Sequence, residues 1–228
     1  MNIKLVKYPT DEDWMLCKQA ALATMRKKAV NPPDFEWKEA ILKANHSPIR
    51  ELKFVFYLED IPSYVSVHLV RHVHATPYVS SQRNDRQFNY DRRKAPQDTP
   101  VNMMWSMTAE ELITISHKRL CYKASKETRE VIEQLCNLVI SKLPEFAELL
   151  VPNCIYRGGC TEYKEPCGFW NKFIEYEVKN NCDYKDLLNP NIRTYLYHAD
   201  FRKRVYSKLE MAEINKENIN ADNHQRNI

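Results

Sequence analysis

The chain has 228 residues, of which 43% are hydrophobic and 28% are charged, and its formal net charge is +4. Such a length and composition are typical of one globular domain with a sizeable core. The charge is far below that of a dedicated nucleic-acid-binding protein, so no nucleic-acid partner is expected. Only three glycines occur, which excludes a Gly-rich dinucleotide fingerprint and a Gly-rich phosphate loop.

The chain turns charged at Lys4, and no apolar run approaches the roughly 18 residues of a membrane span. We therefore expect neither a signal peptide nor a membrane-spanning segment, and a cytoplasmic protein. The seven cysteines are an odd number in an ordinary globular composition. This favours reduced thiols over a disulfide framework.

The N-terminal part of the chain predicts one strand and two helices. Residues 2–8 are expected to form the strand, and residues 11–28 a helix. The apolar face of this helix carries Trp14, Cys17, Ala21 and Met25. After two prolines, Asp34 is expected to cap a short helix that ends near Asn45.

The next part of the chain predicts a strand that leads into a helix. Apolar residues alternate from Leu52 to Leu58, as in a strand with one buried face. Asp60 to Pro62 is expected to turn the chain into a helix, whose last turn carries Arg71 and His72. Its apolar positions recur at helical spacing, at Ile61, Val65, Leu69 and Val73. Beyond Pro77 we expect a polar loop, and residues 84–102 have little periodicity.

The C-terminal half is predicted to be mainly helical. Thr108 and Glu111 are expected to form a capping box before one helix, and a second helix places Val131, Leu135, Leu138 and Val139 on one face. Residues 183–190 are expected to form a loop, and residues 193–208 a helix. We predict one domain over residues 1–210 and a frayed polar tail over 211–228. Strands followed by long helices predict an α+β fold, with a small antiparallel or mixed sheet and a layer of long helices.

Arginine and histidine gather between His68 and Arg86. Beyond Pro77, hydroxyl and amide groups stand beside Arg83 and Arg86, whose planar guanidinium groups suit bidentate contact with phosphate. The segment is therefore a candidate site for a phosphorylated ligand. A solvated basic loop after a helix C-terminus, where cations are favoured in any case, is the alternative interpretation.

The order of residues in this segment resembles a family signature. Arg71-His72-Val73, seven residues and then Ser81-Gln82-Arg83 is similar to the Arg-His-Arg, seven residues, Ser, one residue, Arg of flavin-dependent thymidylate synthases. Upstream, His46-Ser47-Pro48 and the strand after it are similar to a Ser/Thr-containing loop and strand of that family. The resemblance runs from the N-terminus to about Tyr156.

The resemblance implies an enzyme that methylates dUMP to dTMP, with FAD as cofactor and with NADPH and methylenetetrahydrofolate as co-substrates. It implies that Arg71 bridges flavin and nucleotide and is the catalytic residue. The other flavin-binding candidates are Ser47, His72 and His74, and the nucleotide-binding candidates are Ser81, Arg83 and His68. It also implies a homotetramer with flavin at the subunit interfaces. No metal site is expected, because the spacings of the cysteines and histidines do not match common metal sites.

The chain departs from the family pattern at several positions. Val73 replaces the second motif arginine, Tyr78 and Val79 replace Asn-Glu, Glu148 replaces an arginine, and Lys164 and Pro166 replace an asparagine and an arginine. These changes leave three alternatives open. They are a divergent flavoenzyme for another pyrimidine nucleotide, a non-catalytic nucleotide-binding homologue, and a metal protein built on cysteines. The last would use Cys154, Cys160, Cys167 and Cys182, but their spacing is wider than in common zinc sites, so ordinary buried thiols are favoured.

Overall fold

The computed structural model describes residues 1–86 and 90–201. The predicted tail over 211–228 and the end of the predicted helix 193–208 lie outside the described residues. The chain divides into two compact units, Met1–Asn153 and a second unit that begins at Cys154. Two compact units need not be two domains, so the single domain over residues 1–210 stays a prediction.

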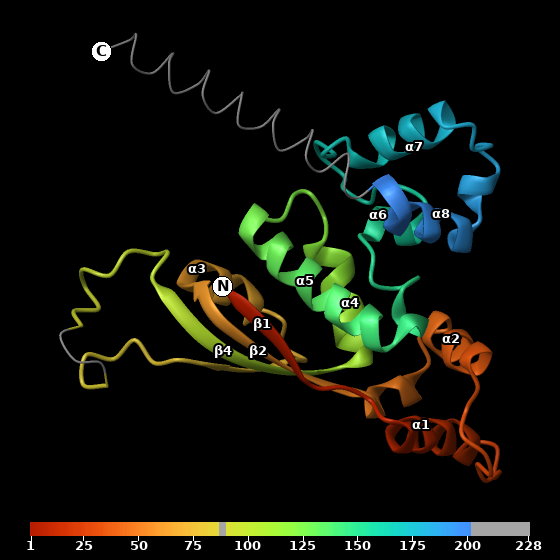
Figure 1. The fold of residues 1–228 in the computed structure, drawn as a ribbon, viewed down its shortest axis with the longest axis horizontal. Helices are drawn as coiled ribbons and strands as arrows, with labels where there is room; N and C mark the ends of the chain where they lie inside the picture. The colour runs from red at the N-terminus through yellow and green to blue at the C-terminus, as the bar shows by residue number, and fades with distance from the viewer. Residues whose placement is uncertain (87–89, 202–228) are drawn as a thin grey trace. The chain divides into compact units, whose positions relative to one another are not determined.

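The N-terminal unit is built on a four-stranded antiparallel sheet in the order β1-β2-β4-β3. The strands are β1 (Asn2–Lys7), β2 (Lys53–Pro62), β3 (Thr76–Val79) and β4 (Pro100–Thr108). Helices lie over one face of this sheet (Figure 1). The predicted α+β class, with a small antiparallel sheet and a helical layer, is confirmed.

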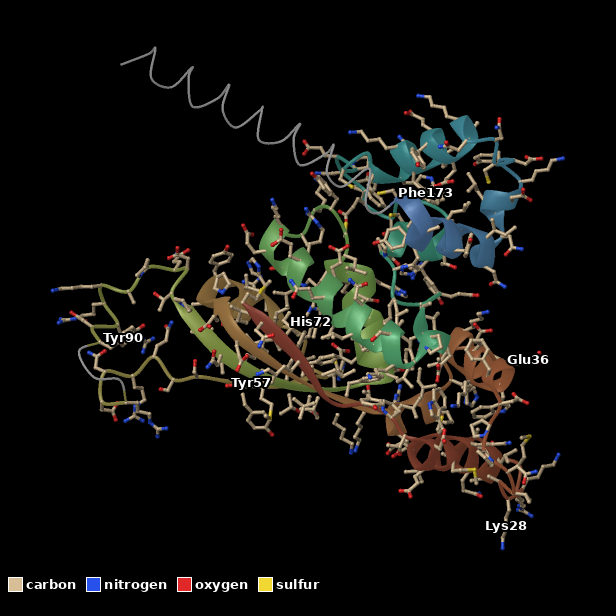
Figure 2. The ribbon with its side chains drawn as sticks, in the orientation of Figure 1. Lys28, Glu36, Tyr57, His72, Tyr90 and Phe173 are labelled. Carbon is tan, nitrogen blue, oxygen red and sulfur yellow. The ribbon has the colours of Figure 1, made fainter. Side chains whose placement is uncertain are left out.

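The core of this unit lies between the sheet and its helices α3 (Ser63–Leu69), α4 (Ala109–Arg119) and α5 (Lys126–Lys142). Phe54, Phe56 and Leu58 of β2 are fully buried, as their alternation predicts. The Phe54 ring meets Phe146 edge to face at a centroid distance of 5.4 Å. On the opposite face of the sheet, Tyr57 points away from the helices (Figure 2).

The two N-terminal helices are confirmed, with one correction. Helix α1 (Asp11–Ala23) starts at a capping box between Thr10 and Asp13, but it ends five residues before the predicted Lys28. The backbone turns left-handed at Arg26, which no helix accommodates, and the predicted face residue Met25 is exposed. Helix α2 (Phe35–Lys43) is capped by the Asp34 side chain, as predicted.

The predicted helix over Ile61 to Val73 is wrong at both ends. Strand β2 continues to Pro62, with a register irregularity between Leu58 and Ile61 and a left-handed backbone at Asp60. Ile61 is therefore a buried strand residue, and Val73 is 82% exposed beyond the helix. Pairing with β4 decided the end of the strand, and this pairing overrode the local helical spacing.

Strands β3 and β4 were not predicted, because prolines interrupt both segments. Pro77 lies in the edge strand β3 and Pro100 at the first position of β4, two places where a missing N–H is tolerated in a sheet. A signal for β4 was present in the sequence. Its buried residues Val101, Met103, Trp105 and Met107 alternate along the strand.

Helices α4 and α5 are confirmed. The Thr108 hydroxyl accepts a hydrogen bond from the Glu111 backbone N–H, which is half of the predicted capping box. The Glu111 carboxylate lies beside His72. In α5, Val131, Leu135 and Val139 are buried.

The C-terminal unit is helical in the residues that the structure describes. It consists of α6 (Asn153–Arg157), α7 (Phe169–Lys179), the 3₁₀ helix Asp186–Leu188, α8 (Pro190–Leu196) and the π-helical turn Tyr197–Phe201. Phe169, Phe173, Leu187 and Tyr197 are buried. No helix of the described residues is long and apolar enough to cross a membrane.

Candidate functional site

The turn between α3 and β3 holds the first half of the signature. Its backbone is closed by hydrogen bonds from the His72 N–H to the Leu69 carbonyl and from the Ala75 N–H to the His72 carbonyl, at 3.1 and 3.0 Å. His72 points into the protein and is 7% exposed, whereas Arg71 and His74 on either side of it are exposed. The turn therefore presents Arg71 outward from a fixed backbone.

Helix α4 supplies the polar partners of the His72 ring. Arg119 Nε donates to His72 Nε2 at 2.9 Å, and Glu111 Oε1 lies 3.5 Å from His72 Nδ1. Residues 111 and 119 lie on one face of the helix, two turns apart. The Trp105 ring packs at a centroid distance of 6.3 Å. Both ring nitrogens of His72 thus have partners within the chain.

The His72 ring is neutral at physiological pH. Burial, together with the positive charges of Arg119 and Lys118, lowers its pKa to about 4. A neutral ring can accept the Arg119 N–H at Nε2 while its own proton stays on Nδ1, facing Glu111. Burial raises the pKa of the Glu111 carboxyl above its usual range. The arrangement holds Arg119 through a neutral acceptor.

This environment predicts an acid-sensitive fold. The unfolded chain takes up a proton on His72 near pH 6.5, whereas the folded chain takes it up only near pH 4. Stability should therefore fall by about 1.4 kcal/mol per pH unit between these values, and this contribution should level off below pH 4. Urea unfolding of the wild-type chain and of His72→Gln from pH 7 to pH 4 measures the difference. Equal slopes for the two proteins would contradict the assignment.

His68 is directed into the helical layer. Its Nδ1 lies 3.1 Å from the hydroxyl of the buried Thr128 on α5, and its ring meets Tyr64 edge to face. Its backbone carbonyl accepts a hydrogen bond from Arg119 Nη2 at 3.1 Å. The nucleotide-binding role of this residue stays a prediction, and the side chain is engaged by protein groups.

Ser47 begins the 3₁₀ helix Ser47–Glu51 and is exposed, on a segment joined to the start of α4. Arg50 of this segment forms a bidentate pair with Glu110, at 2.7 and 3.0 Å. Hydrogen bonding to Arg50 lowers the pKa of the Glu110 carboxyl, and the charge of Arg50 and the nearby His74 act in the same direction. The segment with Ser47 and the turn with His74 therefore both reach the N-terminal end of α4.

Ser81 and Arg83 lie where the chain leaves β3. Ser80 is tied to β4 by hydrogen bonds with Asn102 in both directions, and the Ser81 hydroxyl accepts from the Arg83 N–H. The Arg83 guanidinium is exposed and paired with Asp85 at 2.7 and 2.9 Å. Tyr90, on the described part of the connection between β3 and β4, lies far from the helices of this unit (Figure 2).

The structure thus gathers Arg71, His72 and His74 along α4. Ser81 and Arg83 stand at the base of the extended segment between β3 and β4. Glu111 and Arg119 are polar groups of this site that sequence reasoning missed. A signal was available, because both residues interrupt the side of α4 that otherwise carries apolar Ile115.

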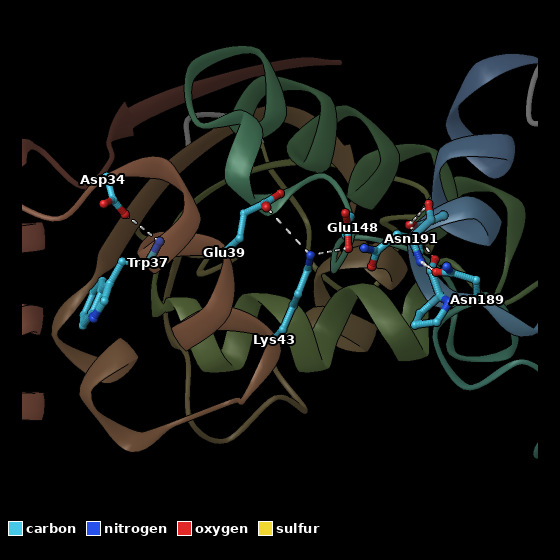
Figure 3. A network of polar contacts seen from close by, with 9 residues as sticks. Asp34, Trp37, Glu39, Lys43, Glu148, Asn189 and Asn191 are labelled. Carbon is cyan, nitrogen blue, oxygen red and sulfur yellow. Dashed lines mark hydrogen bonds and ion pairs between the residues drawn. The ribbon is translucent and has the colours of Figure 1, made fainter.

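Glu148, which stands where the family has an arginine, belongs to a separate ion-pair network. Its carboxylate lies 2.9 Å from Lys43 Nζ of α2, and Glu39 lies 3.8 Å from the same ammonium (Figure 3). The negative charge of Glu148 is therefore balanced inside the N-terminal unit.

Three cysteines of the C-terminal unit, Cys154, Cys160 and Cys167, lie near one another at α6, whereas Cys182 lies near Glu177 and Asp186. Burial, with the nearby thiols of Cys167 and Cys160, raises the pKa of Cys154 to about 12. Cys160 itself is exposed. In the part of the chain that the structure describes, no group of three or more His, Cys, Asp or Glu residues is arranged to hold a metal ion.

The difference in burial between these thiols predicts that alkylation will be selective for the exposed one. Because the thiolate is the reactive form, iodoacetamide at pH 8 should modify Cys160 at least about tenfold faster than Cys154 or the buried Cys17, whose pKa is also raised to about 12. Peptide mass spectrometry over time gives the rates, and the urea-unfolded chain, in which all thiols are accessible, is the control. Modification of Cys154 as fast as that of Cys160 in the folded chain would show the prediction to be wrong.

Comparisons with known proteins agree with this fold and, in sequence, with the part of the chain that follows the signature residues Arg71 to Arg83. A family model described as thymidylate synthase complementing protein matches residues 87–145. Among curated proteins, none matches the chain. Two solved structures of thymidylate synthase X from Helicobacter pylori, both with FAD and dUMP, match at a TM-score of 0.56 and 15% identity. Each match covers 66% of this chain, and 99% and 100% of the other chain.

Proposed function

Since the chain has the fold of the flavin-dependent thymidylate synthases and its resemblance to that family is confirmed, we propose that it is a flavoenzyme of this type. The reaction would be the reductive methylation of dUMP to dTMP, with methylenetetrahydrofolate as carbon donor and NADPH as reductant. The proposed setting is the cytoplasm. The match of the fold and of residues 87–145 supports the proposal.

The turn at Arg71 is the observation that carries the proposal. An exposed guanidinium stands on a backbone fixed at both ends, beside a buried neutral histidine and a second arginine. This donor set fits a phosphate-bearing ligand such as FAD, because guanidinium groups bind phosphate oxygens through charge-assisted hydrogen bonds. The chain has only three glycines and therefore no Gly-rich phosphate loop. Side chains such as these would have to bind a nucleotide in its place.

In this proposal the residues of the chain bind and orient, whereas FAD supplies the hydride transfer when bound. Arg71 holds flavin and nucleotide in register. Ser47 and His74 contact the flavin from the N-terminal end of α4, and Ser81 and Arg83 bind the nucleotide phosphate. In this proposal His72 does not contact the ligand directly, because its two ring nitrogens already interact with Arg119 and Glu111.

A homotetramer is part of the proposal. Ser81 and Arg83 follow the end of β3, whereas Arg71 lies in the turn after α3, near Arg119 at the C-terminal end of α4. The described part of the β3–β4 connection extends away from the helices of the N-terminal unit (Figure 1). A second copy of the chain, with its own extended segment, would complete the groups around each flavin. Such a shared site agrees with the interface position that the family resemblance implies.

One observation favours a second candidate, a flavoenzyme for another pyrimidine nucleotide. Tyr78 and Val79 replace the family's Asn-Glu in β3, and Tyr78 is 64% exposed. A phenol and an aliphatic side chain offer fewer hydrogen bonds to a base edge than an amide and a carboxylate. Base selectivity would change even where phosphate and flavin binding are retained.

An anaerobic assay separates these candidates. The purified chain is mixed with FAD, NADPH, methylenetetrahydrofolate and dUMP, and product mass and flavin absorbance are followed. Formation of dTMP supports the proposed reaction. Flavin binding without dTMP supports the second candidate, and testing other pyrimidine nucleotides then identifies the substrate. A chain that binds neither FAD nor dUMP overturns both.

A further inference from the structure

Arg119 occupies a position that neither the signature nor the family resemblance assigns. It is the last residue of α4 and half-buried. Its Nε donates to His72 and its Nη2 donates to the His68 carbonyl. These two bonds fix the plane of the guanidinium and do not use Nη1. The guanidinium is therefore held in a fixed orientation, and its Nη1 donors remain available to a ligand in the part of the chain that the structure describes.

The partners of Arg119 leave its positive charge in place. In the described residues, neither of its hydrogen-bond acceptors is a carboxylate, since one is a neutral imidazole and the other a backbone carbonyl. The neighbouring carboxylate, Glu111, faces the opposite nitrogen of His72. A guanidinium held by neutral acceptors keeps its full charge for a ligand, whereas an ion pair with a carboxylate would neutralise it.

A second guanidinium stands close by. Arg71 precedes His72, whose ring accepts the hydrogen bond from Arg119 Nε. Burial, together with the positive charge of Arg71, lowers the pKa of Arg119 below its usual range. Two like charges held near each other repel unless an anion lies between or beside them. Arg71 is exposed, so an anion can reach the pair from solvent. The geometry and the charges both suit a phosphate group with several oxygens.

We propose that Arg119 and Arg71 together bind a phosphate group, and that Arg119 supplies the guanidinium that the signature lacks at Val73. Val73 is 82% exposed and offers no polar group, whereas Arg119 reaches the same turn from α4. The inference rests on the proposed function only for the source of the phosphate, which is either the flavin or the nucleotide. His72 is a positioning residue that holds Arg119 in place.

The test compares Arg119→Gln with two matched variants of the full chain. Lys118→Gln removes the same charge from the next, exposed position of α4, and Arg119→Lys keeps the charge but loses the forked donor. Calorimetry measures Kd for inorganic pyrophosphate, FAD and dUMP. Arg119→Gln should raise Kd about tenfold or more, Arg119→Lys by less, and Lys118→Gln by less than about threefold.

A second readout shows whether the variant keeps the fold. In a folded Arg119→Gln chain the pKa of His72 should rise above about 4 but stay below the 6.5 of the unfolded chain, because burial still disfavours the charged ring, and NMR titration of the ring detects this. Weaker binding of FAD alone, or of dUMP alone, identifies which phosphate Arg119 contacts. Equal Kd values for wild type and Arg119→Gln would overturn the inference and leave the flavoenzyme proposal standing.

Pyrophosphate separates the two proposals. Binding of pyrophosphate that is lost in Arg119→Gln, in a chain that binds neither FAD nor dUMP, supports the anion site and overturns the proposed function. A wild-type chain that binds none of the three ligands overturns both.

Discussion

Replacing Arg193 by methionine is expected to lower the free energy of unfolding of the C-terminal unit by about 3 kcal/mol or more. Arg193 is 4% exposed and donates to backbone carbonyls from two segments. Its Nε donates to Ile155 and its Nη2 to Tyr156 in α6, while Nη1 donates to Leu187 and Leu188. Methionine has a similar length but no donor, so these carbonyls would lose a charged partner in a buried place.

Urea unfolding followed by the NMR signal of the Trp170 indole N–H, which is read separately from those of the other three tryptophans, measures this effect within the unit. Lys172→Met, an exposed position of α7, is the matched control and should change the midpoint little. Arg193→Lys should fall between the two, because one ammonium cannot reach all the carbonyls that the guanidinium spans. Equal midpoints for Arg193→Met and Lys172→Met would show that the carbonyls find other partners.

Replacing Arg71 by alanine is expected to raise Kd for FAD and for dUMP by about 100-fold or more, if both ligands meet at this guanidinium. Each charge-assisted contact to phosphate contributes about 1.5 to 3 kcal/mol, and a residue that bridges two ligands affects both. The fold should be unaffected, because Arg71 is exposed and its turn is closed by backbone hydrogen bonds at His72 and Ala75.

Calorimetry and flavin absorbance provide the Kd values, and the thermal midpoint monitors the fold. Lys28→Ala removes one positive charge far from the turn (Figure 2) and controls for the change in net charge. Affinities that stay within about threefold of wild type for both ligands would remove Arg71 from the site. A loss for FAD alone would limit Arg71 to the flavin.

The sequence was sufficient where the signal was local. The capped helix at Asp34, the alternation from Leu52 to Leu58 and the apolar face of α5 each lie within one segment, and the structure confirms them. Strand β3 was not predicted, because its four residues include Pro77 and only pairing with β4 makes them a strand. Here the tertiary contact, not the local pattern, decided the conformation.

The candidate site also combines features that a local signal predicts with features that depend on tertiary packing. The spacing of the signature marked Arg71 and His72, and the structure places both in one turn beside α4. The pattern of α4 marks Glu111 and Arg119 as polar residues on an apolar side, but their contacts with His72 could not be predicted, because those depend on how α4 packs against the turn. Burial of His72 likewise follows from packing, whereas its neighbours Arg71 and Val73, which flank it in the sequence, are exposed.

The strand order β1-β2-β4-β3 also bears on how the chain folds. In the central pairing, Lys53 lies opposite Thr108 and Pro62 lies opposite Pro100. The chain between β2 and β4, which includes α3 and β3, therefore forms one long loop that closes when the two strands pair. Closing such a loop costs chain entropy that no local contact repays at once. Non-local antiparallel pairing of this kind slows folding relative to a helical bundle. The C-terminal unit, whose described elements are short helices, is therefore expected to form its structure first in a refolding experiment.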